Sequence, residues 1–79
     1  MKVEVKYFGM IAEKLGKQME EISLNNDQID IDLEVFFQTT YPELKNLTYQ
    51  IAVDQNFRSV ISSQETIKEI ALLPPFAGG

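Results

Sequence analysis

The residues with the clearest chemical potential in this sequence are the two glycines that end it, Gly78 and Gly79. Because glycine has no side chain, such a backbone can pass through a narrow channel and approach a ligand closely. The group it delivers is the α-carboxylate of Gly79. A carboxylate becomes an acyl donor when ATP adenylates it, and exchange of the adenylate for sulfur gives a thiocarboxylate. We therefore predict that Gly79 is the reactive residue and that a separate enzyme uses the ATP, with no cofactor bound stably by this chain.

The residues just upstream are suited to presenting that carboxylate to another protein. Pro74 and Pro75 have no backbone N–H, so the chain should leave its last strand extended and stiff. At ~3.1 Å per residue, residues 74–79 would reach roughly 19 Å. Phe76 is a candidate anchor for a pocket on the partner. Ala77 is small enough to follow the anchor into a channel.

Composition argues against several other kinds of site. The 79 residues include no cysteine and no histidine, which removes thiol chemistry, the usual proton shuttle near neutral pH and the commonest metal ligand. The formal net charge of −5 is unfavourable for nucleic acid, because phosphate binding needs clustered Lys and Arg. The N-terminus is charged where a signal peptide is apolar, and the apolar runs are too short to span a bilayer. We expect a soluble, cytoplasmic protein with no metal site, no nucleic-acid or membrane partner and no independent catalysis.

Hydrophobic periodicity predicts the elements that must position the tail. Alternating apolar residues indicate strands. Leu33, Phe36 and Phe37 have the i, i+3, i+4 spacing of an amphipathic helix, which Pro42 should end. The predicted strands are residues 1–8, 19–24, 49–54, 57–61 and 68–73, the predicted helices are residues 10–15 and 33–41, and a turn is predicted at residues 25–27.

These elements predict an α+β domain over residues 1–73, followed by an extended tail over residues 74–79. The first and last strands are the most apolar, so we expect them side by side in the centre of a mixed sheet. They should be parallel, because a chain that returns through a helix crosses over. One main amphipathic helix would cover one face of the sheet. This is a β-grasp arrangement, although spacing alone does not distinguish it from other small α+β sheets.

The last strand also predicts a surface for a partner. Ile70 and Leu72 point to one face of the sheet and Ala71 and Leu73 to the other. A helix on one face can bury only one of these pairs, so the other should join Phe8 in an exposed apolar patch. The predicted partner-binding residues are Phe8, Leu72, Pro74, Pro75, Phe76, Ala77 and Gly78.

The sequence resembles the small, sulfur-carrying subunits of molybdopterin synthase, within the ubiquitin-like β-grasp superfamily that also holds the thiamine sulfur carriers. The resemblance lies in Val5-Lys6-Tyr7-Phe8, Ile11-Ala12-Glu13, Tyr41-Pro42, Ala52-Val53-Asp54 and, most specifically, Glu69-Ile70-Ala71-Leu72-Leu73-Pro74-Pro75-Phe76-Ala77-Gly78-Gly79. It implies that Gly79 is adenylated by an ATP-dependent, E1-like enzyme and then thiocarboxylated. It also implies that the tail enters the active site of the large synthase subunit, where sulfur reaches a pterin precursor to form a dithiolene.

Two departures and three alternatives accompany this resemblance. The family usually has a Gly-Asp turn before the last strand, where this chain has Ile67 and Lys68, and Phe76 stands where Val is more frequent.

A thiamine sulfur carrier would share the fold and the terminus, although the helix at residues 10–15 and the Leu-Leu-Pro-Pro exit favour the molybdopterin role. A ubiquitin-like modifier would instead be joined to a target lysine through Gly79. The third alternative is an interaction module without chemistry.

Overall fold

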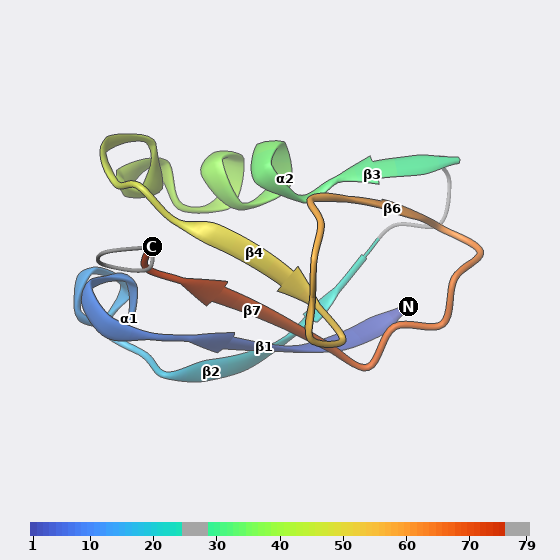
Figure 1. The fold of residues 1–79 in the computed structure, drawn as a ribbon, viewed down its shortest axis with the longest axis horizontal. Coiled ribbons are helices and arrows are strands. Elements are labelled where there is room, and N and C mark those ends of the chain that lie inside the picture. The colour runs from blue at the N-terminus through green and yellow to red at the C-terminus, as the bar shows by residue number, and fades with distance from the viewer. Residues whose placement is uncertain (25–28, 76–79) are drawn as a thin grey trace.

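The computed structural model describes residues 1–24 and 29–75. Its main sheet lies under an eight-residue helix, α2, and a seven-residue helix, α1, lies at one end (Figure 1). The elements are β1 (Lys2–Tyr7), α1 (Gly9–Leu15), β2 (Met19–Ser23), β3 (Asp30–Asp32), α2 (Leu33–Thr40), the 3₁₀ helix η1 (Pro42–Asn46), β4 (Gln50–Val53), β5 (Asn56–Phe57), β6 (Val60–Ser62) and β7 (Glu69–Leu73).

The main sheet has the strand order β2-β1-β7-β4-β5. β1 and β7 are neighbours and run parallel, with Val5 opposite Ile70 and Tyr7 opposite Leu72. The other pairings, β1 with β2, β7 with β4 and β4 with β5, are antiparallel. The predicted β-grasp arrangement, with parallel first and last strands inside a mixed sheet, is therefore confirmed.

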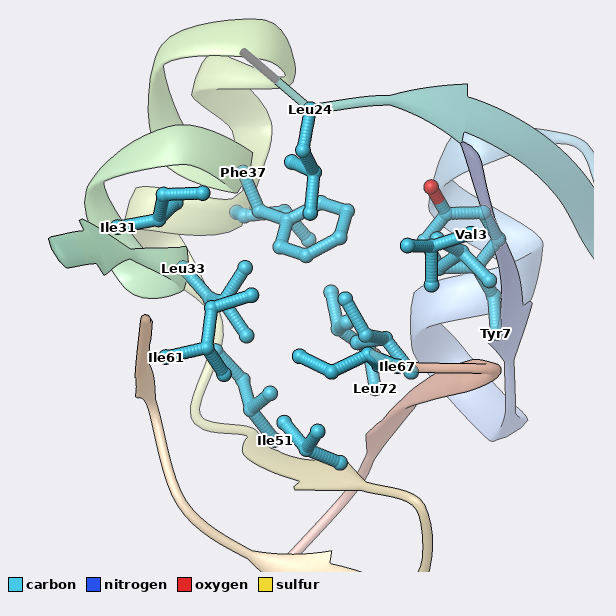
Figure 2. Packing of buried hydrophobic residues seen from close by; sticks show 14 of the residues in the cluster. Val3, Tyr7, Leu24, Ile31, Leu33, Phe37, Ile51, Ile61, Ile67 and Leu72 are labelled. Atoms are coloured by element: carbon cyan, nitrogen blue, oxygen red, sulfur yellow. The ribbon is translucent and has the colours of Figure 1, made fainter. Parts of the chain in front are cut away.

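The hydrophobic core lies between α2 and one face of this sheet. Asp32 caps the helix, because its Oδ1 accepts a hydrogen bond of 3.2 Å from the Val35 amide. Leu33 and Phe37 of α2 are both 0 % exposed and point toward the sheet (Figure 2). On the sheet side, alternate β1 residues such as Val5 are buried, while the residues between them face away from α2.

One predicted strand needs correction, and two elements were not predicted. Residues 57–61 do not form one strand: they are divided between β5, at the edge of the main sheet, and β6, which pairs with β3 in a separate two-stranded sheet. β3 itself has only one apolar residue, Ile31, so alternation could not reveal it. The 3₁₀ helix η1 was also not predicted; it buries Leu44 under the end of α2. The turn predicted at residues 25–27 lies outside the described residues.

A polar cluster closes the core beside β2. Glu20 Oε2 accepts hydrogen bonds from the hydroxyls of Tyr7 at 2.5 Å and Tyr41 at 2.6 Å. Lys17 Nζ lies 3.3 Å from Glu20 Oε1 and donates to the Tyr41 hydroxyl at 3.0 Å. Burial alone would raise the pKa of the Glu20 carboxyl, but hydrogen bonds from Tyr41, Tyr7 and Lys17 outweigh it and lower this pKa. The carboxylate thus ties an edge strand to the central strand and to the end of α2.

Replacing Glu20 with Gln should therefore make the protein less stable in a pH-dependent way. The lowered pKa means that ionised Glu20 stabilises the fold above the pKa of an unfolded glutamate, about 4.3, and that this contribution is lost as pH falls through the folded pKa. At pH 7 we expect Glu20→Gln to lower the free energy of unfolding by about 1–2 kcal/mol. Urea titrations from pH 7 to pH 3 should show this difference shrinking below about pH 4.3. A difference that stays constant would contradict the role assigned to the charge.

Candidate functional site

The candidate site begins where the chain leaves the middle of the sheet. β7 ends at Leu73, at the same end of the sheet as α1 (Figure 1). The last ladder bond near this end runs from the Phe8 amide to the Leu72 carbonyl at 3.1 Å. Pro74 follows without an N–H to extend the ladder. Pro74 and Pro75 are both exposed, so the chain leaves the sheet at its surface rather than through the core.

We call Pro74-Pro75, where the chain leaves the sheet, the exit. It packs against the corner at which β1 turns into α1. Gly9, the first residue of α1, has a φ of +59°, in the left-handed region that glycine adopts most easily. A Cβ placed on Gly9 would lie 3.2 Å from Cγ of Pro74. We did not predict Gly9 from the sequence, although a glycine between a strand and a helix is a signal for such a corner.

Of the predicted tail over residues 74–79, the structure describes residues 74 and 75. Phe76, Ala77, Gly78 and Gly79 lie outside the described residues, so their roles as anchor, spacer and reactive end remain predictions. Of the predicted partner-binding residues in the described part, Phe8, Pro74 and Pro75 lie together at the exit. Leu72 does not join them: it is 0 % exposed and belongs to the core under α2, because it alternates with Leu73 along β7.

The face of the sheet opposite α2 carries an apolar area next to the exit. Cross-strand pairing places Ala71 of β7 beside Ala52 of β4 and Lys6 of β1. Phe8 is 43 % exposed and Met19 is 53 % exposed on the same side. We call the group formed by Phe8, Met19, Ala52, Ala71 and Leu73 the open-face patch. Ala71 and Leu73 are the outward pair, but Ala71 and Ala52 are only 8 % and 7 % exposed, so Phe8 and Met19 are the exposed members of this patch.

Charged residues occupy the rest of this face and reach into the patch at Lys6, which pairs with both Met19 and Ala71. Lys6 Nζ lies 3.3 Å from Glu69 Oε2 and 3.9 Å from Glu4 Oε1, and Lys2 lies 4.0 Å from Glu21. These ion pairs are exposed and therefore contribute little to stability. Phe8 and Leu73, in contrast, lie at the end of the sheet from which the tail departs. A partner that covered the open-face patch would also receive the tail.

The loop before β7 is held by the carboxylates of Asp54 and Glu65. Asp54 Oδ1 accepts hydrogen bonds from the amides of Glu69 at 2.9 Å and Lys68 at 3.1 Å, at the point where β7 begins. Arg58 forms a two-pronged ion pair with Glu65, with both N···O distances at 2.8 Å. The hydrogen bonds from Arg58 lower the pKa of the Glu65 carboxyl. These contacts fix the register of β7, and with it the position of the exit.

A metal site is not found in the described part of the chain. Among residues 1–24 and 29–75, no group of three or more acidic side chains could hold a metal ion. Within the same residues, no helix is both long and apolar enough to cross a bilayer.

No family model matches the sequence. The structure, however, is similar to several solved structures over almost their entire lengths. A Pyrococcus furiosus protein, provisionally named molybdopterin converting factor subunit 1, is 25% identical, with a TM-score of 0.71, and the match covers 96% of this chain and 99% of that one. The chain has the ubiquitin-like β-grasp fold. The resemblance to ubiquitin-like sulfur carriers that the sequence suggested is thereby confirmed.

Two Haloferax volcanii structures share this ubiquitin-like fold. One is named SAMP1; it is 18% identical, with a TM-score of 0.69, and the match covers 100% of both chains. The other is named small archaeal modifier protein 1; it is 17% identical, with a TM-score of 0.67, and the match covers 95% of this chain and 98% of that one. At such identities the similarity is one of fold. The ubiquitin-like chain thus has structural neighbours named for two different functions.

Proposed function

We propose that this chain is a sulfur carrier that acts as the small subunit of molybdopterin synthase. The observation that carries the proposal is the course of β7, which runs through the centre of the sheet and leads directly into the exposed Pro74-Pro75 exit toward Gly79. The similarity to the Pyrococcus furiosus protein named as a molybdopterin converting factor subunit supports it. The proposal implies a cytoplasmic location, where ATP is available.

The proposed chemistry takes place at the carboxylate of Gly79. A carboxylate oxygen attacks the α-phosphorus of ATP in an adenylating enzyme, and pyrophosphate leaves. Hydrosulfide, supplied by a sulfur donor, then attacks the acyl carbon and AMP leaves, so that a thiocarboxylate remains. This sulfur attacks a carbon of the pterin precursor and displaces an oxygen leaving group from that carbon. Water then cleaves the acyl–sulfur bond, which leaves the sulfur on the pterin and restores the carboxylate. The domain itself contributes no catalytic side chain: its part is to carry and present the terminus.

The proposed partner is a large catalytic subunit that binds the open-face patch and receives the tail. Phe8 and Leu73 flank the exit, so a protein seated on them would have its own active site within reach of residues 74–79. Phe76 would add an aromatic anchor, with Ala77 and Gly78 following it into the channel. The numbered subunit name of the Pyrococcus furiosus neighbour supports a complex of this kind.

A ubiquitin-like modifier is the second candidate, and the Haloferax volcanii neighbours named as archaeal modifiers favour it. Adenylation of Gly79 would be the same first step. A lysine amine of a target protein, instead of hydrosulfide, would then attack the acyl carbon, and an isopeptide bond would form. A thiamine sulfur carrier would differ only in the acceptor of the sulfur. The three functions therefore share the activated terminus and diverge in the product.

The length of the tail provides a test of the proposed chemistry. A chain that ends at Gly78 still has a carboxylate, but this carboxylate falls about 3.1 Å short of the original position. We expect ATP–pyrophosphate exchange by the adenylating enzyme to be lost, while the free energy of unfolding changes by less than about 0.5 kcal/mol. The control is Gly79→Ala, which keeps the length and should retain part of the exchange. Undiminished exchange by the shortened chain would contradict the proposed role of Gly79.

The open-face patch can be tested by placing a charge on it. Phe8→Asp should weaken binding to the large synthase subunit by about ten- to a hundredfold, at ~1.4 kcal/mol per decade. Stability should change little, because Phe8 occupies the N-cap of α1, where Asp is favoured. The matched control is Val35→Asp on α2, since Val35 is 59 % exposed on the helix side of the sheet. Calorimetric titrations in which both variants bind equally well would exclude this face as the docking surface.

A further inference from the structure

We infer that Gly9 is a positioning residue that sets the direction in which the tail leaves the sheet. Its missing side chain lets Pro74 pack against the corner between β1 and α1. The inference deepens the proposed function and rests on it, because an exit direction matters only if the terminus must be delivered to another protein. The contact between Gly9 and Pro74 is itself a feature of the fold.

The register of the two central strands brings these residues together. β1 and β7 pair in parallel with Tyr7 opposite Leu72, so continuing the same register places Gly9 opposite Pro74. In a parallel ladder, the bond after Phe8 N–H to Leu72 C=O would run from the amide of residue 74 to the carbonyl of Phe8. Pro74 has no N–H to make it. The Phe8 carbonyl accepts instead from the Ile11 amide at 3.2 Å, in the first turn of α1.

β1 and β7 therefore stop pairing at the same register position, and each does so because of the residue that it has there. β1 turns into α1 at Gly9, whose φ of +59° is strained for any residue with a side chain. β7 continues outward as Pro74, whose ring fills the space beside the Gly9 backbone. A Cβ on Gly9 would meet Pro74 Cγ at 3.2 Å, Cδ at 3.7 Å and Cβ at 4.0 Å. Only the contact with Cγ is tighter than ordinary van der Waals contact, so the Pro74 ring would have to give by a few tenths of an ångström, through its pucker or through the position of the chain.

This packing would reduce the cost of binding the tail. Pro74 is fixed in φ by its own ring and in position by the Gly9 corner, and Pro75 restricts the next bond. The direction of the exit is then set before any partner binds, so less conformational entropy is lost when the tail enters a channel. Displacing Pro74 should loosen that direction. The effect should fall on the affinity of an enzyme for the tail, and not on the chemistry at Gly79.

The chain provides a matched control for this idea. Gly16, at the C-cap of the same helix, has a φ of +72°, and a Cβ placed on it meets nothing within 4 Å. Gly9→Ala and Gly16→Ala therefore introduce similar backbone strain at the two ends of α1, but only Gly9→Ala crowds Pro74. Any effect of Gly9→Ala on the tail beyond that of Gly16→Ala reports the contact.

The direction of the exit can be measured without any enzyme. The sequence has no cysteine, so spin labels can be placed only where Thr39→Cys, exposed on α2, and Ala77→Cys introduce them. Pulsed electron paramagnetic resonance then gives the distribution of distances between α2 and the tail. We expect Gly9→Ala to shift or broaden this distribution and Gly16→Ala to leave it unchanged. Equal distributions in the two variants would overturn the inference.

Adenylation kinetics test whether this direction matters for delivery. With an E1-like enzyme that adenylates the unmodified chain, Gly9→Ala should raise KM about tenfold, the change that about 1.4 kcal/mol of lost positioning produces, and leave kcat unchanged. Gly16→Ala should leave both constants unchanged. In a Pro74→Ala background, which removes the ring, Gly9→Ala should have no larger effect than Gly16→Ala.

The outcomes separate this inference from the proposed function. An unchanged KM in Gly9→Ala, together with a shifted distance distribution, would overturn the role of Gly9 in delivery. A fall in the kcat of Gly9→Ala without a rise in its KM would also overturn the role of Gly9 in delivery. If no E1-like enzyme adenylates the unmodified chain, the proposed function fails, whereas the distance distributions still decide whether Gly9 sets the exit.

Discussion

The parallel pairing of β1 with β7 imposes the geometry on which the other features of this protein depend. Because the two strands run in the same direction, the chain between them must cross over, and α2 lies in that crossover and covers one face of the sheet. The same pairing carries the end of β7 to the end of β1. The tail consequently starts beside α1, in the middle of the sheet, and not at a frayed edge.

The two faces of the sheet differ in what covers them, and we assign partner binding only to the face opposite α2 under the proposed function. On the α2 side, residues such as Val5, Phe37 and Leu72 form a closed apolar core, and the Glu20 carboxylate with its two tyrosine partners closes the rim. On the other side, the ion pairs of Lys6 adjoin the open-face patch, whose residues Phe8 and Leu73 lie beside the exit. Substitutions on this second face should therefore alter binding without greatly altering the fold, which suits a small domain with little stability to lose.

Hydrophobic periodicity predicted an element correctly where apolar residues recur at a regular spacing along it. Alternation in β1 and the stripe of Leu33 and Phe37 in α2 gave the sheet, the helix and the layer between them. β3 was missed because three residues with a single isoleucine carry no periodic signal, and its partner β6 was merged with β5 for the same reason. Alternation along β7 does not say which face the helix covers. The sequence therefore did not decide which pair of β7 residues faces outward, and Leu72 was wrongly predicted to contact a partner.

The role of Gly9 could not be predicted for a different reason. Its contact is with Pro74, at the far end of the chain, and depends on the register of a parallel pair that no local pattern fixes. Glycine and proline are each signals for a break in regular structure, and the sequence has one at position 9 and the other at position 74. That they meet follows only once β1 and β7 are placed side by side.

The central claim is that this fold exists to carry a reactive C-terminal carboxylate. It is tested most directly by fragment mass spectrometry of the full chain after incubation with ATP, an adenylating enzyme and a sulfide source. The account predicts a single exchange of oxygen for sulfur, located in the C-terminal fragment at Gly79, with every other fragment unchanged. Sulfur or AMP found on another residue, or a terminus that stays a carboxylate under these conditions, would contradict it.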